Sequence, residues 1–502
     1  MSPLNRAAGL LAALTSLTSL ISLPALGVAA PAPGTPLKEC RVAGIANSVQ
    51  CGAVRRPLDP ARPNGGQIDV HYVVVPAMAR QKLADPVFLL AGGPGQSAIA
   101  LAPALMPLFA RLNNRRDIVF VDQRGTGRSA PLQCDDTSRE PFSGDEDPEQ
   151  QIAALKRCRV QLEKLPHVNG AEGLRHYTTT TAMQDLDAVR RQLGAARIDL
   201  VGASYGTRAA LEYMRQYPTA VRRSVLDGVM PPDMAVPAAA SIDAQAAFDA
   251  LFAACEREAA CARAYPALRA DWKALLQSLP KQVVAVDALT GTHSAVRLTR
   301  EVLLGTVRGP LYVPALAAAL PAAIHAAARG HYEALVGLAS MLASRKGTQL
   351  AMGMHFSVVC AEDAPLLTSA NDRPGADFGT DFAQLYRRVC ADWPRGDVAA
   401  AFYRVPPATS AVLLLSGGSD PATPPRHAAR IAAALGPFAR HVVVPNAGHG
   451  IIGIGCMRDV LFRFIDAEND KDALAVDTGC ALQIPRPLAF QPVASAPKAA
   501  SR

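Results

Sequence analysis

Short apolar runs recur along the chain, and most of them lead through a glycine-rich turn into a helical pattern. The runs that predict strands cover residues 68–76, 87–91, 117–122, 198–201, 223–226, 411–416 and 441–444. The periodic segments that predict helices extend up to residue 112 and over 148–165, 181–194, 207–217, 425–435 and 456–468. Strands that alternate with helices are typical of a doubly wound, mostly parallel sheet. The chain is therefore expected to have an α/β fold.

The middle of the chain has a different pattern, which begins after Met-Pro-Pro at 230–232. From there the sequence is mostly helical in pattern, with few β-branched runs. The predicted helices cover residues 239–258, 267–279 and 314–342. We interpret residues 233–405 as a helical cap inserted over the carboxyl edge of the sheet. The sheet core then comprises 67–232 and 406–486, and residues 31–66, rich in Pro, Gly and Arg, are expected to form an irregular N-terminal segment.

The two ends of the chain are expected to lie outside the folded core. Residues 1–30 have the layout of a secretory signal, because Arg6 precedes an uncharged stretch rich in Leu and Ala that ends in small residues. Cleavage is expected after Ala29 or Ala30, although the stretch is long enough to serve as an uncleaved anchor. Residues 487–502, rich in Pro, Ala and Ser, are expected to be disordered. The pattern predicts a secreted or periplasmic protein without stable membrane insertion after cleavage.

Composition excludes two broad classes. Half of the residues are hydrophobic and 19% are charged, which argues against extensive disorder. The net charge of +8 suggests a nucleic-acid partner, but the arginines occur as scattered pairs without a basic run or interleaved aromatics. We therefore expect no nucleic-acid binding. The sequence leaves the oligomeric state open.

Ten cysteines fall into five pairs of near neighbours along the chain. The pairs are Cys40 with Cys51, Cys134 with Cys158, Cys255 with Cys261, Cys360 with Cys390, and Cys456 with Cys480. Disulfides suit an exported protein, and the alternative of metal ligation is weakened because no Cys-x-x-Cys occurs and no His stands beside them at ligand spacing. We expect five local disulfides, with the connectivity left open by the spacing. Neither a metal nor an organic cofactor is expected.

A Gly-x-Ser-x-Gly motif lies between a predicted strand and a predicted helix, at Gly-Ala-Ser-Tyr-Gly, 202–206. In that setting the two glycines permit a sharp turn, and the serine hydroxyl projects above the sheet beside the N–H groups that open the helix. Ser204 is therefore the candidate nucleophile. The alternative is a glycine-rich strand-to-helix turn with no catalytic role.

A serine hydroxyl needs a base, and the base needs a carboxylate that fixes its tautomer. His449 lies in a glycine-flanked loop after a late strand, and Asp420 follows the strand at 411–416. Both positions fall at the carboxyl edge of the sheet, and the order Ser204, Asp420, His449 is that of an α/β-hydrolase. Asp227 also ends a strand and is the alternative acid, unless it only closes its own turn.

The oxyanion of such a reaction needs two N–H donors. One is expected to be the backbone N–H of Tyr205, and the other that of Gly93 in the turn Gly-Gly-Pro-Gly at 92–95. This turn lacks the Gly-Lys-Ser/Thr of a phosphate loop. A purely structural tight turn is the alternative.

Together these motifs, with Asp-Gln-Arg-Gly-Thr-Gly-Arg-Ser at 122–129, resemble the proline iminopeptidase family of α/β-hydrolases. More closely, the chain is similar to the secreted branch related to tripeptidyl aminopeptidases, with its TAP-like C-terminal region. Ala91 departs from that pattern, since iminopeptidases usually carry histidine there. The resemblance implies an α/β-hydrolase fold with a helical cap.

The resemblance also implies a function. Members of the family cleave short peptides from a free N-terminus and use cap carboxylates to pair with the substrate's ammonium group. Glu362 and Asp363 are the candidates here, unless they belong to a solvated turn of the cap held by Cys360. Arg124 and Arg128 are expected to brace the loop near the oxyanion turn.

The leading hypothesis is an exported serine aminopeptidase that releases residues or short peptides through an acyl-enzyme. A carboxylesterase or lipase-like hydrolase of acyl esters is the alternative, because the same triad hydrolyses esters. A non-catalytic binding protein on this fold is a third hypothesis.

Overall fold

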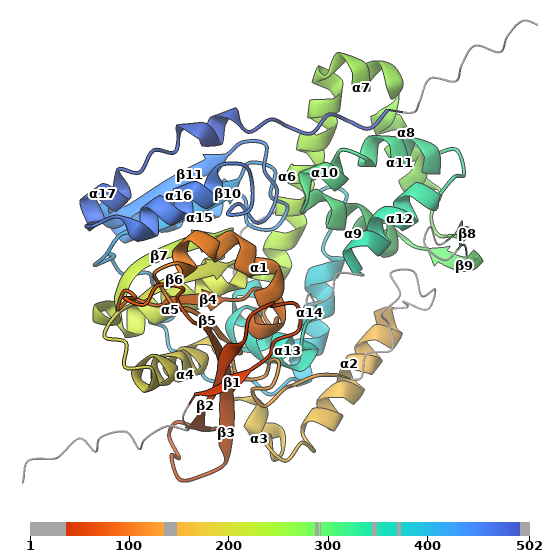
Figure 1. Ribbon diagram of the computed structural model, residues 1–502. Helices are drawn as coiled ribbons and strands as arrows, with labels where there is room; N and C mark the ends of the chain where they lie inside the picture. The colour runs from red at the N-terminus through yellow and green to blue at the C-terminus, as the bar shows by residue number, and fades with distance from the viewer. Residues whose placement is uncertain are drawn as a thin grey trace, which may run out of the picture.

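The computed structural model describes residues 37–134, 148–286, 291, 293–343, 349–368 and 373–491. The predicted signal segment, the polar loop after Cys134 and the last residues of the tail lie outside the described residues. A nine-stranded sheet forms the centre of the molecule, and it is flanked by helices on both faces (Figure 1).

The strands of the sheet follow the order β1-β2-β3-β5-β4-β6-β7-β10-β11. They span Lys38–Cys40 (β1), Val49–Pro57 (β2), Gln67–Val75 (β3), Val87–Leu90 (β4), Ile118–Val121 (β5), Ile198–Ala203 (β6), Val221–Asp227 (β7), Val412–Gly417 (β10) and Ala439–Val444 (β11). From β5 to β11 all neighbours are parallel, whereas β1, β2, β3 and β5 pair antiparallel. The prediction of a doubly wound, mostly parallel sheet is confirmed.

Strands β4 and β5 are buried on both faces, which explains their wholly apolar sequences. In β4, Phe88 and Leu90 face one helical layer, and Val87 and Leu89 face the other. One layer contains α1 (Ala98–Asn113) and α16 (Met457–Asp466). The opposite layer contains α4 (Thr179–Gln192), α5 (Tyr205–Gln216) and α15 (Pro425–Leu435). These layers leave the carboxyl ends of the parallel strands free for loops.

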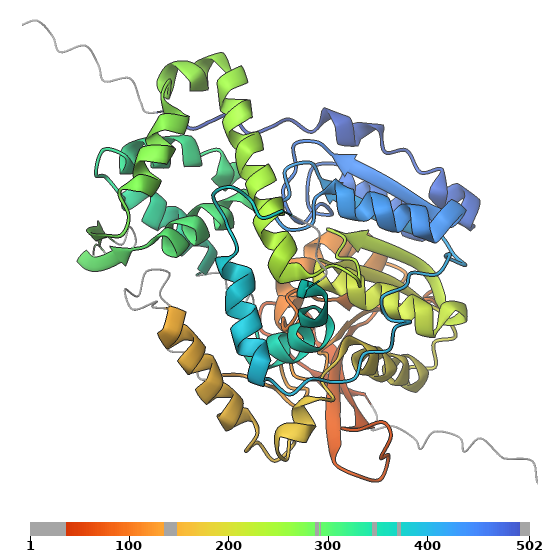
Figure 2. The same cartoon turned by 180° about the vertical axis from the view of Figure 1, so that it is seen from behind.

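A separate hydrophobic core holds the inserted cap together. Its elements are α6 (Val236–Arg257), α7 (Ala259–Ala264), α8 (Leu268–Gln277), β8 (Lys281–Val286), β9 (His293–Leu298), α9 (Arg300–Leu311), α10 (Pro314–Ala317), α11 (Leu320–Ala327) and α12 (Glu333–Ala343). Figure 2 shows the long α6, in yellow-green, leading from the sheet into this cap. The later helices α13 (Met352–Glu362) and α14 (Asp381–Asp392) instead bury side chains in the core shared with the sheet, as does α2 (Pro148–Leu162).

Several predicted elements are wrong in detail. The single helix predicted over 314–342 is divided into three, because Pro321 lies at the start of α11 and Gly330, at φ +92°, follows its end. The cap also contains a β-hairpin, β8–β9, that the helical pattern did not predict. Helix α4 begins at Thr179, two residues before the predicted Thr181, because the Thr178 side chain accepts the N–H of Thr181 and caps the helix.

The two ends of the described chain are more regular than predicted. Residues 49–57 form β2, which pairs with β3 from Gln50–Val74 to Pro57–Gln67, so the prediction of an irregular segment over 31–66 is wrong there. Near the C-terminus, Phe490 N–H donates to the Ala318 carbonyl (2.9 Å), and this last described segment runs beside the cap (Figure 1). Disorder from residue 487 is therefore wrong for residues 487–491.

All five expected disulfides are present: Cys40–Cys51, Cys134–Cys158, Cys255–Cys261, Cys360–Cys390 and Cys456–Cys480. Such bonds persist in compartments that do not reduce thiols, so the covalent structure is consistent with an extracellular or periplasmic protein. Among the helices of the described ranges, none is long and apolar enough to cross a membrane.

Candidate active site

Ser204 lies at the tip of the turn between β6 and α5, in a backbone conformation that side chains rarely adopt (φ 56°, ψ −122°). Close approach of backbone on both sides requires the flanking glycines. A Cβ at Gly202 would lie 2.4 Å from the Gly206 carbonyl oxygen, and one at Gly206 would lie 2.1 Å from that of Leu90. Helix α5 begins with the next residue, so its N-terminal N–H groups lie beside the serine. This is the strand–turn–helix geometry predicted for the nucleophile.

Asp420 and His449 form a hydrogen-bonded pair, with 2.8 Å between Oδ2 and Nδ1. Asp420 follows β10, is buried, and accepts further bonds from the Ala422 and Thr423 N–H groups (2.8 and 3.0 Å). Burial alone would raise the pKa of Asp420, but the imidazole and these donors hold it below its usual value. Burial likewise opposes charge on His449, yet the Asp420 carboxylate raises the pKa of the imidazole. The pair is arranged to stabilise an imidazolium.

The loop that carries His449 is held against the cap. The His449 N–H donates to the Tyr312 carbonyl (2.9 Å), and the tyrosine ring packs edge-on against the imidazole, with 5.1 Å between ring centres. Gly448 permits this contact, because a Cβ there would lie 2.4 Å from the same Tyr312 oxygen. Tyr312 follows α9, so the position of the candidate base depends on the cap as well as on the sheet.

Asp227, the alternative acid, accepts hydrogen bonds from the backbone of the loop that follows His449. Its carboxylate accepts the Ile451 N–H with both oxygens (2.8 Å each) and the Ile452 N–H with one (2.9 Å). Burial raises the pKa of this carboxyl, against the effect of those two donors. Asp420, not Asp227, contacts the imidazole. The geometry therefore favours Asp420 as the acid.

Ser204 and His449 lie on either side of the short segment Asp227–Gly228. The Ser204 N–H donates to the Asp227 carbonyl (2.8 Å), and a Cβ at Gly228 would lie 3.0 Å from Cε1 of His449. No hydrogen bond joins the serine hydroxyl to the imidazole within the described residues. Bonds of this kind are often long before substrate binds. Ser204 and the Asp420–His449 pair thus lie beside the same segment at the carboxyl end of β7.

The predicted oxyanion turn, residues 92–95, lies against the nucleophile. A Cβ at Gly92 would be 3.2 Å from Cβ of Ser204, and Gly93 has φ +110°. The start of α13 holds the turn from the other side, since the Ala351 N–H donates to the Gly95 carbonyl (2.9 Å). The donor roles of the Gly93 and Tyr205 N–H groups remain predictions.

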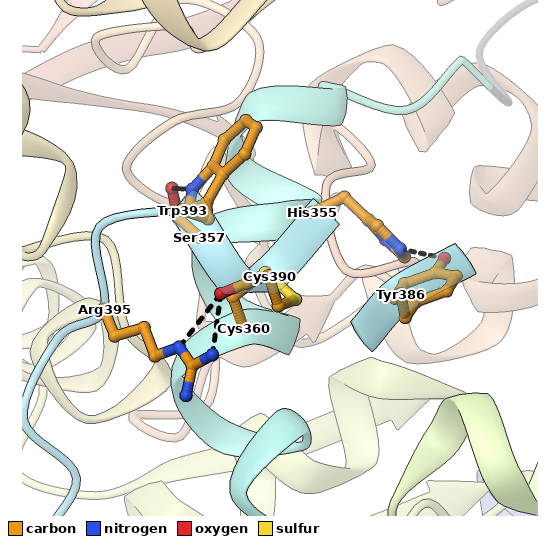
Figure 3. The surroundings of a disulfide bond; sticks show 7 residues. All are labelled: His355, Ser357, Cys360, Tyr386, Cys390, Trp393 and Arg395. Atoms are coloured by element: carbon orange, nitrogen blue, oxygen red, sulfur yellow. Dashed lines mark hydrogen bonds between the residues drawn. A yellow bond between two sulfur atoms is a disulfide. The ribbon is translucent and has the colours of Figure 1, made fainter. Parts of the chain in front are cut away.

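A second contact between α13 and the oxyanion turn passes through His355. Its Nδ1 lies 3.1 Å from the Pro94 carbonyl oxygen, and its Nε2 lies 2.7 Å from the hydroxyl of Tyr386 in α14. Figure 3 shows the Cys360–Cys390 disulfide joining the same two helices. Burial lowers the pKa of His355 despite its bond to the Pro94 carbonyl, so its neutral form is favoured. Sequence reasoning missed this support, because His355 belongs to no motif.

Glu362 and Asp363 end α13 and are both buried, at 1% and 0% exposure. Asp363 pairs with Arg208 of α5 (2.8 and 3.1 Å), and Glu362 accepts the N–H and the hydroxyl of Thr179 (2.7 and 2.9 Å). The alternative of a solvated turn is wrong, since both carboxylates face protein. Arg208 was not predicted, although it follows the nucleophile by one helical turn. Contact of either carboxylate with a substrate's ammonium group stays a prediction.

The two arginines of the segment 122–129 have different surroundings. Arg124 is buried and binds both carboxylate oxygens of Asp185 (2.7 and 3.0 Å), which confirms its role as a brace. Arg128 has an exposed side chain, and only its N–H contacts Asp122 (3.3 Å). Asp122 in turn accepts the Ser97 hydroxyl (2.7 Å) and so anchors the end of the oxyanion turn. Nowhere in the described ranges do His, Cys, Asp and Glu gather in a group that could hold a metal ion.

Two family models match this chain. The α/β hydrolase fold model matches residues 85–258, and the TAP-like protein model matches residues 376–473. The chain therefore has an α/β-hydrolase fold and carries a TAP-like C-terminal region, as the resemblance predicted.

Three named relatives share sequence similarity with this chain. A tripeptidyl aminopeptidase of Streptomyces coelicolor is 32% identical over 193 residues, which are 37% of this chain and 36% of that protein. Serine protease Hip1 of Mycobacterium tuberculosis is 31% identical over 205 residues, 38% of this chain and 37% of that protein. Carboxylesterase B of Mycobacterium tuberculosis is 27% identical over 420 residues, 78% of each chain. The chain thus spans little more than a third of the first two relatives' length.

Proposed function

We propose that the protein is an exported serine hydrolase that acts as an aminopeptidase and releases residues or short peptides from free N-termini. The observation that carries the proposal is that Ser204, on its strained turn, and the hydrogen-bonded Asp420–His449 pair both contact the segment Asp227–Gly228. This arrangement performs nucleophilic acyl transfer without a cofactor. The five disulfides support export to a secreted or periplasmic location.

In the proposed first half-reaction, Ser204 Oγ attacks the scissile carbonyl while His449 Nε2 accepts the hydroxyl proton. Asp420 holds the Nδ1 proton and stabilises the imidazolium that forms. The N–H groups of Tyr205 and Gly93 donate to the oxyanion. The C–N bond then breaks, and His449 returns its proton to the leaving amine. The product is an acyl-enzyme on Ser204.

Water completes the cycle. His449 removes a proton from the water that attacks the acyl carbon, and the same oxyanion donors stabilise the second tetrahedral intermediate. Collapse of this intermediate breaks the ester bond to Ser204 and returns the proton to its oxygen. The acid product leaves, and the triad is regenerated.

Peptide hydrolysis is supported by the relatives named tripeptidyl aminopeptidase and serine protease, and by the TAP-like region. Ester hydrolysis is the second candidate, because the match to carboxylesterase B covers 78% of this chain. The purified protein should be assayed on aminoacyl and tripeptidyl arylamides, each with a free and a blocked amine, beside short acyl esters. Preference for free-amine arylamides supports the aminopeptidase. Equal hydrolysis of blocked substrates, or of esters alone, contradicts it.

A further inference from the structure

A cavity of about 450 Å³ lies between the cap and the helices that support the site. Its walls come from α2, α6, α9 and α14, which Figures 1 and 2 show converging beside the sheet. Apolar side chains such as Leu304, Phe378 and Phe382 form much of the lining. A pocket of this kind, mostly apolar with a few polar groups, is typical of a small-ligand site.

Arg308 of α9 contributes a cation to this cavity, whose wall also carries the carboxylates of Glu301 and Asp381. Within the described residues it forms no ion pair or hydrogen bond, and its Nε is buried without a partner. Its guanidinium lies near two aromatic rings, 5.5 Å from the centre of Tyr312 and 5.9 Å from that of Phe382. An unpaired buried donor costs free energy unless a ligand satisfies it. Arg388, another arginine of the cavity wall, is already paired with Glu149 (2.6 Å).

The unpaired guanidinium lies close to the candidate base. Tyr312 lies near both groups, since its ring centre is 5.5 Å from the Arg308 guanidinium and 5.1 Å from the centre of the His449 imidazole. The charge of Arg308 also acts on the imidazole, where it opposes protonation. Arg308 is therefore one tyrosine ring away from the candidate base, although none of Ser204, Asp420 and His449 lines the cavity itself.

We propose that Arg308 binds a carboxylate of the substrate, and that the enzyme prefers short peptides carrying an acidic group next to the scissile bond. A planar guanidinium binds carboxylates through paired hydrogen bonds, and here it lies in a largely apolar wall that strengthens them. The inference rests on the proposed function. It differs from the expected roles of Glu362 and Asp363, which concern the opposite charge of the substrate.

The carboxylate has two possible sources, which matched substrates distinguish. On the acyl side, Ala-Ala-Glu-4-nitroanilide is compared with Ala-Ala-Gln-4-nitroanilide. On the leaving-group side, Ala-Ala-Ala linked to 4-aminobenzoate is compared with its 4-aminobenzamide analogue. We expect the wild type to prefer the acidic member of one pair, and Arg308→Gln to lower that preference, as a ratio of kcat/KM, by about 10- to 100-fold. Arg308→Lys should keep part of it.

Arg388→Gln is the matched control, because it removes a paired arginine from the same cavity wall and should leave the preference unchanged. A second readout avoids turnover: calorimetry of the peptide acid Ala-Ala-Glu against Ala-Ala-Gln, on Ser204→Ala and on Ser204→Ala/Arg308→Gln. Loss of tighter Ala-Ala-Glu binding only in the double variant supports the inference. A wild type that hydrolyses both pairs without preference, or a preference that survives Arg308→Gln, overturns it. Failure to hydrolyse any peptide refutes the proposed function instead, and calorimetry still tests Arg308.

Discussion

Replacing Asp420 and Asp227 by asparagine, one at a time, distinguishes the acid of the proposed triad from a carboxylate with a structural role. The Asp420 carboxylate contacts the imidazole of His449. The Asp227 carboxylate instead accepts backbone N–H groups of the loop that follows His449. In Asp420→Asn the amide either presents its NH₂ group to the imidazole or favours the wrong tautomer. We expect turnover to fall by roughly 10⁴-fold, as in other serine triads.

The same exchange at Asp227 has a different cost. One asparagine oxygen still accepts the N–H groups of Ile451 and Ile452, because both bond to Oδ2. The amide NH₂ then replaces Oδ1, which accepts the Ile451 N–H at 2.8 Å, and opposes that donor. We expect a loss of unfolding free energy of about 1–3 kcal/mol. If the exchange displaces the histidine loop by about 1 Å, we expect turnover to fall by about 10²-fold and no further.

The assay measures kcat and KM with the best arylamide substrate, and unfolding free energy by urea titration, for the wild type and both variants. Retained folding in Asp420→Asn shows that its lost turnover is chemical. The reasoning is refuted if Asp227→Asn loses roughly 10⁴-fold in kcat while Asp420→Asn stays active.

Three further predictions follow from the surroundings of single groups. The Asp420 carboxylate, acting against burial, raises the pKa of His449 above 6.5. The acid limb of the pH profile of kcat/KM should therefore have its midpoint above pH 6.5. A midpoint below that pH contradicts the pairing of Asp420 with His449. Burial raises the pKa of Glu362 from 4.5 to about 7, so the folded protein retains a proton that the unfolded chain releases between these values. Stability should therefore fall as pH rises through that window, and urea titrations of Glu362→Gln should lack this slope. Replacing Cys456 and Cys480 by serine removes a disulfide whose cysteines are 24 positions apart, which should lower the free energy of unfolding by about 3 kcal/mol. The same variant should lower kcat more than it raises KM. An unchanged melting temperature would exclude the predicted loss of stability.

The alternation of strands and helices and the nucleophile turn were predictable because local signals agreed with the final fold. A buried parallel strand has an apolar sequence, and the backbone contacts around Gly202 and Gly206 leave no room for a Cβ. The helix over 425–435 was predicted to the residue, since Pro425 lies at its first position and Gly436 follows its end. The five disulfides join the cysteines that are near neighbours along the chain, as expected, although the spacing alone left the connectivity open.

The supports of the site were not predictable in the same way. Arg208 and Asp363 are 155 positions apart, and His355 and Pro94 are 261 apart, so only the folded chain brings each pair together. Acidic residues after Cys360 looked solvated because charged side chains are seldom buried. The hairpin β8–β9 was missed because its neighbours along the chain have helical patterns, and its own short alternation of apolar and polar residues was a weaker signal.

Reaction of Ser204 with a serine-directed fluorophosphonate tests the proposed mechanism most directly. Labelled protein is digested and mapped by mass spectrometry, with Ser204→Ala as the matched variant and urea titration as the check on folding. The proposed triad predicts one adduct, on Ser204, with labelling and hydrolysis both abolished in a folded Ser204→Ala protein. An adduct on another serine, or full hydrolysis by Ser204→Ala, would contradict it.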